Sequence, residues 1–262
     1  MPKRNKPSNN RAKHYTMTGI NPIVTLLEND PAKVLKVMIA DNSQSHRIQQ
    51  TMTLVQQHDI KIEELPSEQF NQKFQGVTQG IAAEVLLSKP RNYNQLKTFL
   101  DKLSELKNKK GSDVLLVILD QIQDPHNLGA VLRTADAAGV DAVIMSENNS
   151  VPLNATVRKV ASGGAENVPV YSVTNLNRAI DAIKDAGIWL VGTTDHAEQS
   201  IYDQQFSGDI ALVMGSEGTG MRRLTEQACD FLIKLPMQGV VNSLNVSVAT
   251  GVCLYEINRQ RG

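Results

Sequence analysis

Three polar loops of the sequence carry residue types that could bind a ligand and assist a reaction. They are residues 120–129 (DQIQDPHNLG), 215–220 (GSEGTG) and 237–245 (MQGVVNSLN), and each follows an apolar run. Ligands of open parallel sheets bind beyond the carboxyl ends of the strands, so these loops are candidate sites. Glu217 lies between glycines, where the backbone can approach a ligand and a carboxylate can face a cation.

The same loops exclude several common kinds of site. The first lacks the G-x-G-x-x-G pattern of dinucleotide-binding proteins, and the second lacks the Lys-Ser/Thr ending of a phosphate-binding P-loop. A G-x-S-x-G nucleophile elbow is absent, which argues against a serine hydrolase. The five histidines are scattered, and Cys229 and Cys253 have no zinc-binding spacing, so the sequence predicts no metal site.

Asn127 and Arg133 also fit purely structural roles. Asn127 could accept a hydrogen bond from a free backbone N–H as the N-cap of the following helix. Arg133 stands among apolar residues of that helix, where it could be a surface arginine paired with Asp136 or Asp124. From these residues alone, a structural and a catalytic interpretation are both open.

Taken together, three segments resemble the signature motifs of the SpoU/TrmH family of RNA ribose 2′-O-methyltransferases. They are residues 119–139, 212–221 and 235–251, in the order and spacing of the family. Residues 19–28 (GINPIVTLLE) and 79–85 (QGIAAEV) resemble the substrate-binding domain of the subgroup that methylates a guanosine in large-subunit ribosomal RNA. The resemblance covers nearly all of residues 17–260.

The resemblance implies an α/β fold with two domains. Residues 113–262 are expected to form an α/β-knot (SPOUT-type) methyltransferase domain with a trefoil knot, whose loops bind S-adenosylmethionine in a bent form. Two knotted domains are expected to pair as a homodimer. Residues 17–88 are expected to form a small α/β RNA-binding domain that is similar to a ribosomal protein.

The resemblance also assigns site residues by position. The catalytic positions are Arg133, Asn127, Glu217, Ser243 and Asn245. The positions that bind the methyl donor are Gly215, Leu235 and Leu244, together with Thr193 and Met237.

The ribose 2′-hydroxyl is a poor nucleophile until its proton moves, and the resemblance makes Arg133 the activator. A guanidinium has a pKa above about 12 and is hard to deprotonate. We therefore expect Arg133 to hold the adjacent phosphate and stabilise the developing alkoxide, while the proton leaves to phosphate or water. Asn127 and Asn245 are expected to orient the ribose and the knot loop, and Glu217 to brace Arg133 or the loop glycines.

The elements that must position these residues alternate along the chain. Apolar runs predict strands at 113–119, 140–146, 168–173, 188–192, 209–215 and 230–236. Helices are predicted at 128–138, 154–162, 175–186, 222–228 and 243–258, the last capped by Asn242 or Ser243. Strands separated by helices predict a parallel sheet with right-handed crossovers.

The amino-terminal third predicts a smaller layer and its connections. Strands are predicted at 34–40, 60–65 and 81–87, with short helices between them. Residues 89–112 place apolar side chains at helical spacing among lysines, which predicts a basic helical linker. Residues 1–16 predict a basic disordered tail.

The zero net charge of the 262-residue chain is unevenly distributed. Residues 1–19 and 89–112 each carry +5, whereas residues 20–88 carry −3 and residues 113–262 carry −7. An RNA-docking surface neutralises phosphates with basic side chains. It is therefore expected in the basic tail, residues 89–110, Arg158 and Lys159, and Arg222 and Arg223.

Composition limits the compartment. With 41% hydrophobic and 4% aromatic residues the chain is typical of soluble globular proteins, and no run approaches the roughly 18 apolar residues of a membrane span. The basic start lacks the apolar stretch of a secretory signal, and two cysteines make no disulfide framework. A reduced, cytoplasmic protein is expected.

The resemblance implies methyl transfer from S-adenosylmethionine to the ribose 2′-hydroxyl of a guanosine in 23S ribosomal RNA, in the peptidyl-transferase P-site loop. A transfer-RNA ribose 2′-O-methyltransferase is an alternative, because the knot motifs do not choose the substrate. A non-catalytic RNA-binding or ribosome-assembly factor is another, although the intact polar positions count against it. An enzyme that acts on small-molecule nucleotides is least favoured, because such a substrate would not require the amino-terminal domain or the basic linker.

Overall fold

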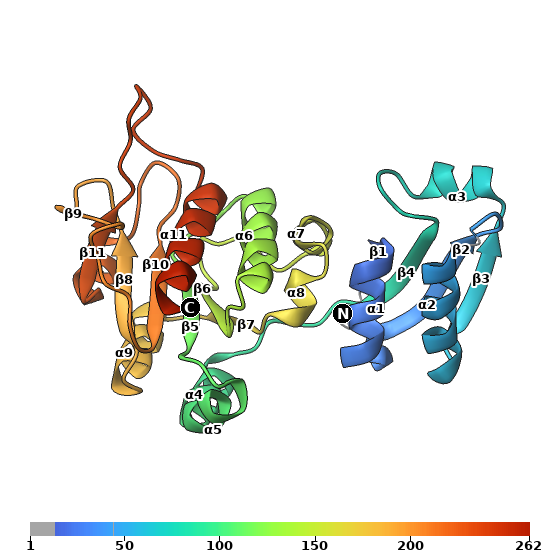
Figure 1. Cartoon of the computed structure of the whole chain (residues 1–262), viewed down its shortest axis with the longest axis horizontal. Helices are drawn as coiled ribbons and strands as arrows, with labels where there is room; N and C mark the ends of the chain where they lie inside the picture. Colours follow the sequence, from blue (N-terminus) through green and yellow to red (C-terminus); the bar gives the residue numbers. More distant parts are fainter. Residues whose placement is uncertain (1–13, 44) are drawn as a thin grey trace, which may run out of the picture. The chain divides into compact units, whose positions relative to one another are not determined.

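The computed structural model describes residues 14–43 and 45–262, and the chain divides into two compact units between Ser88 and Lys89 (Figure 1). Most of the predicted tail, residues 1–16, lies outside the described residues. Its last three residues instead begin strand β1 (His14–Thr18), because Tyr15 and Met17 of this strand alternate into the core. No helix of the described residues has the length and apolar character of a membrane span.

The first unit is a four-stranded mixed sheet with helices on both faces. Its elements are β1, α1 (Ile20–Asn29), the 3₁₀ helix η1 (Pro31–Lys33), β2 (Val34–Ala40), α2 (His46–Gln57), β3 (Lys61–Leu65), α3 (Ser67–Lys73) and β4 (Ile81–Leu86). The strand order is β1-β4-β2-β3; β2 and β3 are parallel and the other pairs antiparallel. Ile23 and Leu27 of α1 and Val55 of α2 pack on one face, and Phe70 of α3 packs on the other.

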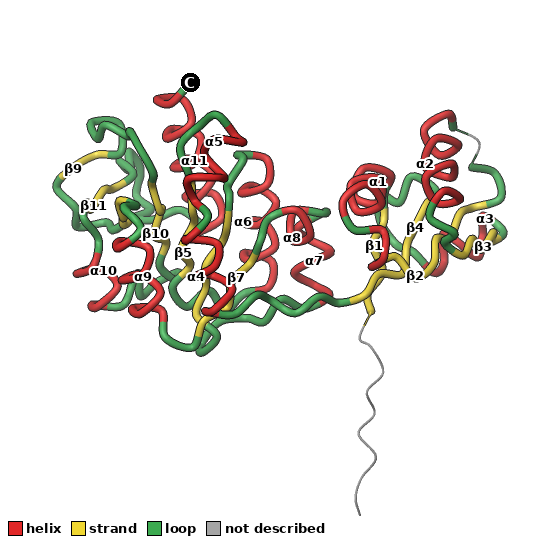
Figure 2. Tube along the Cα trace, turned by 90° about the horizontal axis from the view of Figure 1, so that it is seen from below, coloured by secondary structure: helices red, strands yellow, loops and turns green. Residues whose placement is uncertain are grey.

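The second unit is a seven-stranded parallel sheet between two layers of helices (Figure 2). Its elements are α4 (Tyr93–Asp101), α5 (Leu103–Lys110), β5 (Leu115–Leu119), α6 (Pro125–Ala137), β6 (Ala142–Ser146), α7 (Ala155–Ala161), α8 (Gly164–Asn167), β7 (Val170–Val173), α9 (Leu176–Asp185), β8 (Trp189–Thr193), β9 (Gln199–Ser200), β10 (Ile210–Met214), α10 (Arg223–Ala228), β11 (Phe231–Lys234) and α11 (Val246–Arg261). The strand order is β7-β6-β5-β10-β8-β11-β9. The alternation of strands and helices follows the sequence pattern; the short elements α8 and β9 were not predicted.

Strand β5 shows why this sheet has such apolar strands. Leu115, Val117 and Leu119 pack in one core with α6, α7 and α11. Leu116 and Ile118 point the other way and pack in a second core with α4 and α9. Because both faces are covered, the strand has no polar alternation. Helix α11, red in Figure 1, lies beside α6 on the first of these faces.

The range predicted as a basic helical linker, residues 89–112, forms helices α4 and α5 and belongs to the second unit. Its buried leucines in the core of that unit are Leu96, Leu100 and Leu103. Lys107 Nζ lies 2.9 Å from Asp209 Oδ2, and Lys110 Nζ lies 2.9 Å from Asp141 Oδ2. Two basic residues that were expected in the RNA-docking surface therefore anchor α5 to the sheet.

Candidate active site

Adjacent strands bring the three polar loops to one edge of the second sheet. β5, β10, β8 and β11 are neighbours and parallel, so their carboxyl ends point the same way. The loops after β5, β10 and β11 begin at Asp120, Gly215 and Leu235. From β5 the chain first builds the sheet toward β6 and β7 and then continues on the other side with β8 and β10. Ligands of open parallel sheets bind at such a switch point.

Asn127, Glu217 and Asn245, each from a different loop, form one hydrogen-bonded network. The Nδ2 atoms of Asn127 and Asn245 donate to Glu217 Oε1 over 2.9 and 2.7 Å, and Asn245 Nδ2 also donates to Asn127 Oδ1 over 2.9 Å. The backbone N–H of Val246 donates to the same carboxylate oxygen over 3.3 Å. Glu217 therefore braces the two asparagines, and not Arg133 as one expectation had it.

The start of helix α6 differs from the prediction. Its N-cap is Asp124, whose Oδ1 accepts from the backbone N–H of His126 over 2.8 Å, and Pro125 is its first residue. Proline is preorganised for this first position and has no N–H to satisfy, which explains the earlier start. Asn127 lies inside the helix, 8% exposed, and its side chain is turned to Glu217.

The start of helix α11 also differs. The helix begins at Val246, and its N-cap is Asn245, whose Oδ1 accepts from the backbone N–H of Ser247 over 2.9 Å. Asn242 and Ser243, the predicted caps, precede the helix. Asn245 is thus a cap through its oxygen and a member of the network through its nitrogen.

The second loop has its shape because of glycine. Ser216 and Gly220 exchange two backbone hydrogen bonds of 3.0 Å, which close the loop on itself. A Cβ atom on Gly215 would lie 2.2 Å from the carbonyl carbon of Gly220, so a larger residue does not fit. Gly218 has a φ of +85°, a conformation that other residues avoid. Glu217 is presented between these glycines.

A cavity of about 420 Å³ lies beside the network. Among the predicted site residues, those that line it are Thr193, Gly215, Glu217, Ser243 and Leu244. Its ionisable lining consists of Asp195, His196, Glu217 and Glu226, and the described residues that line it include no lysine or arginine. Such a cavity attracts a ligand with positive charge and repels phosphate groups.

His196, at this cavity, was not predicted as a site residue. Its Nε2 lies 3.0 Å from Glu226 Oε1, and its Nδ1 lies 2.7 Å from Thr194 Oγ1 and 3.3 Å from Asp195 Oδ1. The carboxylates of Glu226 and Asp195 raise the pKa of His196 above its ordinary value of 6.5. Within the described residues, no group of three or more His, Cys, Asp or Glu side chains could hold a metal ion.

Arg133, Leu235 and Met237 are not brought to this cavity. Arg133 is exposed on α6, and none of the described residues forms a hydrogen bond or ion pair with its side chain, so the surface pairs with Asp136 or Asp124 are not formed. Leu235 packs against the core, and Met237 is half-buried in the third loop.

Two arginines expected in the RNA-docking surface have structural partners instead. The fully buried Asp120 accepts from the backbone N–H of Arg222 over 2.9 Å and from its Nε over 2.8 Å, which ties the second loop to the end of β5. Asp120 is the first polar residue after a continuous apolar run, a signal that could have revealed it. Arg158 is 2% exposed and forms an ion pair with Glu166.

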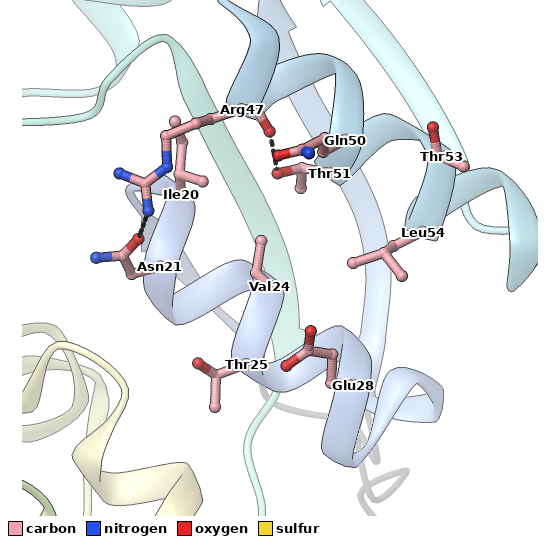
Figure 3. A pocket seen from close by; sticks show the side chains of 10 residues that line it. All are labelled: Ile20, Asn21, Val24, Thr25, Glu28, Arg47, Gln50, Thr51, Thr53 and Leu54. Carbon is pink, nitrogen blue, oxygen red and sulfur yellow. Dashed lines mark hydrogen bonds between the residues drawn. The ribbon is translucent and has the colours of Figure 1, made fainter.

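The first unit has a groove of about 560 Å³ between α1 and α2 (Figure 3). Arg47, on α2, donates from Nη2 to Asn21 Oδ1 of α1 over 2.6 Å. Most of the other polar side chains in the lining are uncharged amides and hydroxyls. Because the guanidinium is already engaged, the groove lacks the convergent charged groups of a catalytic site, and we place the candidate active site in the second unit.

Two family profiles match the chain. The profile of the SpoU rRNA Methylase family matches residues 114–255, more than half of the chain. The chain belongs to the SpoU rRNA methylase family. A second profile, described as RNA 2′-O ribose methyltransferase substrate binding, matches residues 17–93. The family predicted from the three motifs is confirmed.

Curated relatives in this family align with almost the whole chain. The 23S rRNA (guanosine-2′-O-)-methyltransferase RlmB of Pectobacterium atrosepticum is 47% identical over 246 residues, which are 93% of this chain and 97% of the relative. Proteins of the same name from Pseudomonas aeruginosa and Pseudomonas putida are 45% and 43% identical over 243 residues, with 93% of this chain and 95% of each relative covered.

Solved structures in the family share the fold. The SpoU methyltransferase AviRb of Streptomyces viridochromogenes, in complex with AdoMet, has a TM-score of 0.74 at 22% identity, covering 97% of this chain and 94% of that one. An RNA 2′-O ribose methyltransferase has a TM-score of 0.72 at 25% identity, covering 95% and 90%. The predicted fold class is confirmed: a SpoU-type α/β domain follows a smaller α/β domain in the chain.

Proposed function

We propose that this chain transfers a methyl group from S-adenosylmethionine to the ribose 2′-hydroxyl of a guanosine in 23S ribosomal RNA. The observation that carries the proposal is an acidic cavity that directly adjoins the Asn127–Glu217–Asn245 network. The cavity suits a cationic methyl donor, and the network offers polar groups for a ribose. The RNA and the base follow the name that the curated relatives carry.

The cavity fits S-adenosylmethionine in size and charge. Its volume of about 420 Å³ falls within the roughly 300–1,000 Å³ of small-molecule sites. The ligand carries a sulfonium and an ammonium group, which the carboxylates of Asp195, Glu217 and Glu226 can face. The residues that would hold it are Thr193, Gly215 and Leu244, with Leu235 and Met237 at the start of the loop to which Leu244 belongs.

The residues of the chain would prepare the ribose for reaction. When bound, S-adenosylmethionine supplies a methyl group activated by its positive sulfur; the new bond forms to the ribose oxygen as the carbon–sulfur bond breaks. Asn127 and Asn245, held by Glu217, would position the ribose, and Ser243 offers a hydroxyl at the cavity wall. Arg133 would hold the neighbouring phosphate and stabilise the alkoxide, while the proton leaves to phosphate or water.

Arg133 is outside the cavity of its own chain, so we propose that a second copy supplies it in a homodimer. Exposed apolar side chains on α11 and in the third loop support such a contact. They are Val240, Val241, Leu244, Val248 and Tyr255, which are between 39% and 99% exposed. Exposed apolar side chains that gather on one surface mark interaction sites.

A trefoil knot in the second unit is part of the same proposal. Strand β10 lies between β5 and β8, although β8 precedes it in the chain. The chain therefore returns to the middle of the sheet before β11 is added beyond β8. This strand order supports a threaded chain. The similarity of the first unit to a ribosomal protein likewise remains a prediction.

The P-site loop of the RNA and action in the cytoplasm are the finer parts of the proposal. The substrate-binding profile matches the first unit. It supports ribosomal RNA over transfer RNA, because a separate substrate-binding domain suits a large structured RNA. Both cysteines are free, which agrees with a reducing compartment.

The test is transfer of labelled methyl from S-adenosylmethionine to protein-free 23S ribosomal RNA that lacks its natural modifications, followed by mapping of the product. We expect label on one guanosine ribose, and loss of transfer in Arg133→Ala but not in Arg178→Ala, an exposed arginine of α9. No transfer despite measured S-adenosylmethionine binding would contradict the ribosomal substrate. No binding of S-adenosylmethionine would contradict the enzyme itself.

A further inference from the structure

A second cavity, of about 310 Å³, adjoins the acidic one. The two share Ser216, Glu217, Thr219 and Val246 in their walls. The rest of the second cavity is formed mainly by residues 121–124, in the loop after β5, and by Asn127. It therefore lies where the loops after β5 and β10 meet, which is the switch point of the sheet.

The network forms part of the wall of both cavities. Glu217 lines both, and Asn127 lines the second. Methyl transfer requires two ligands in contact, so the compartment beside the proposed donor site is the place for the accepting nucleotide. Gln121, at the start of this wall, has a φ of +65°, an unfavourable conformation for a residue with a side chain. Residues with such backbone strain cluster at functional sites.

The wall of the second cavity offers unused hydrogen-bonding groups. Asp124 uses Oδ1 to cap α6, and Oδ2 has no hydrogen-bond partner among the described residues. The side-chain amides of Gln121 and Gln123 also have no hydrogen-bond partner within the described part of the chain. The residues that line the cavity thus include one unengaged carboxylate oxygen, which only accepts, and two amides, which can donate.

This set matches guanine better than the other bases. The Watson–Crick edge of guanine carries two adjacent donors, N1–H and the 2-amino group, beside the acceptor O6. A carboxylate can accept from the donors while an amide donates to O6. Adenine places an acceptor, N1, where guanine has a donor, and a carboxylate repels it. Enzymes that act on a nucleotide out of its stack read the base in this way.

We propose that this second cavity binds the base of the target nucleotide, and that Asp124, with Gln121 and Gln123, selects guanine. The inference rests on the proposed function and adds the recognition of the base to it. The volume of about 310 Å³, at the lower end of ligand sites, suits a single base.

The experiment uses a 23S RNA fragment in which the mapped guanosine is kept or is replaced by inosine or adenosine. Asp124→Asn is compared with the full-length wild type, because asparagine caps a helix as well as aspartate and so preserves α6. Asp136→Asn, on the same helix and outside the cavity, is the matched control. Circular dichroism and S-adenosylmethionine binding verify that each variant is folded.

We expect wild-type kcat/KM to be about ten- to a hundredfold higher for guanosine than for adenosine, with inosine between, as one charge-assisted hydrogen bond supplies. Asp124→Asn should bring the guanosine-to-adenosine ratio close to one, and Asp136→Asn should leave it unchanged. If Asp124→Asn does not fold, Gln123→Ala should lower the ratio instead.

Equal wild-type rates on guanosine and adenosine would overturn the base site while leaving the methyltransferase in place. A folded Asp124→Asn with an unchanged ratio would overturn the role of Asp124. No methylation of the guanosine fragment by the wild type would contradict the proposed function, so the two proposals fail by different results.

Discussion

Glu217 Oε1 joins three loops because it accepts from Asn127, Asn245 and the backbone of Val246. Hydrogen bonds to a carboxylate are stronger than those between neutral groups. The N–H of Val246 belongs to the first turn of α11, where the helix dipole also favours a negative charge. One exposed carboxylate therefore fixes the direction of two amides at the proposed ribose site.

Replacement of Glu217 should separate catalysis from folding. Glu217→Ala leaves the buried Asn127 amide without its acceptor, so we expect a loss of about 1–3 kcal/mol in the free energy of unfolding and a large loss of methyl transfer. Glu217→Gln keeps an acceptor oxygen and should retain most of the stability. Urea unfolding and single-turnover transfer measure the two effects. An alanine variant with wild-type rate would show that the network has no part in the reaction.

His196 should make binding of the methyl donor depend on pH. Its pKa is raised by Glu226 and Asp195, so the ring stays protonated above pH 6.5 and then becomes neutral as the pH rises further. Its positive charge opposes a cationic ligand in the cavity. The ratio of the dissociation constants of wild type and His196→Gln should therefore fall about 1.5- to 5-fold between pH 6 and pH 9, the size of a solvent-screened charge pair.

Calorimetric titration with S-adenosylmethionine at several pH values provides both dissociation constants. The ionisation of the ligand cancels in their ratio, so the change reports His196 alone. A ratio that is constant with pH would mean that the imidazole charge does not reach the ligand.

At the level of elements, the apolar runs of the second unit predicted its strands because the sheet is covered on both faces. Strand β1 was not predicted. It has only five residues, and it forms because it pairs with β4, which lies far away in the sequence and cannot be read from a local pattern. The caps of α6 and α11 were placed two or three residues away from Asp124 and Asn245, because several cap-forming residues stand close together in each loop.

The site residues divide in the same way: local motifs predict some of them, and others are recognised only by contacts with residues distant in the sequence. Motif positions gave Asn127, Glu217 and Asn245, and the structure brings them within hydrogen-bond distance. The partners of Asp120 and His196 depend on residues about 100 and 30 positions away, so no local spacing could reveal them.

Gly215→Ala should disable the second loop. Its Cβ would lie 2.2 Å from the carbonyl carbon of Gly220, and the loop must move to accept it. We expect at least a tenfold loss of S-adenosylmethionine affinity, measured by calorimetry, because this loop lines the proposed donor cavity. Gly251→Ala is the control: its Cβ would make an ordinary contact of 3.5 Å with Thr134, and alanine is favoured within helix α11. Similar affinities for both variants would contradict the assignment of the loop.

Helix α11 should contribute an acid-sensitive part of the stability. Hydrogen bonds from Arg259 and Gln260 lower the pKa of Glu256 from 4.5 to about 2. The stabilisation is complete above pH 4.5 and is lost as the pH falls toward 2, because the unfolded chain binds the proton first. Glu256→Gln should therefore be less stable than the wild type at pH 7, and the difference should shrink at pH 3. Urea unfolding at both pH values tests this; a difference that does not change with pH would exclude the carboxylate as its cause.

At the scale of the whole molecule, the docking of RNA depends on which basic side chains are not engaged in ion pairs. Lys107, Lys110 and Arg158 form ion pairs within the second unit, and Arg222 is tied to Asp120. By contrast, Lys102 and Lys109 are exposed, and both line a cavity of about 370 Å³ beside α4 and α5, together with Arg91 and Phe99. An aromatic ring among basic side chains is suited to single-stranded RNA. We therefore propose this part of the predicted basic region as the RNA-docking surface.

The double substitution of Lys102 and Lys109 by glutamine should therefore weaken RNA binding and its dependence on salt. Each basic side chain that contacts a phosphate contributes about 0.7–0.9 to the magnitude of the slope of log affinity against log salt. Removal of two such side chains should therefore reduce this magnitude by roughly 1.4–1.8. Lys107→Gln removes one charge from α5, the helix of Lys109, but breaks the ion pairs with Asp209 and Asp113. It should therefore lower the thermal stability and leave the slope nearly unchanged. Filter binding of the 23S fragment at several salt concentrations gives the slopes. If Lys107→Gln changes the slope as much per charge as the double variant does, the RNA responds only to the net charge of the region and not to a surface formed by the free lysines.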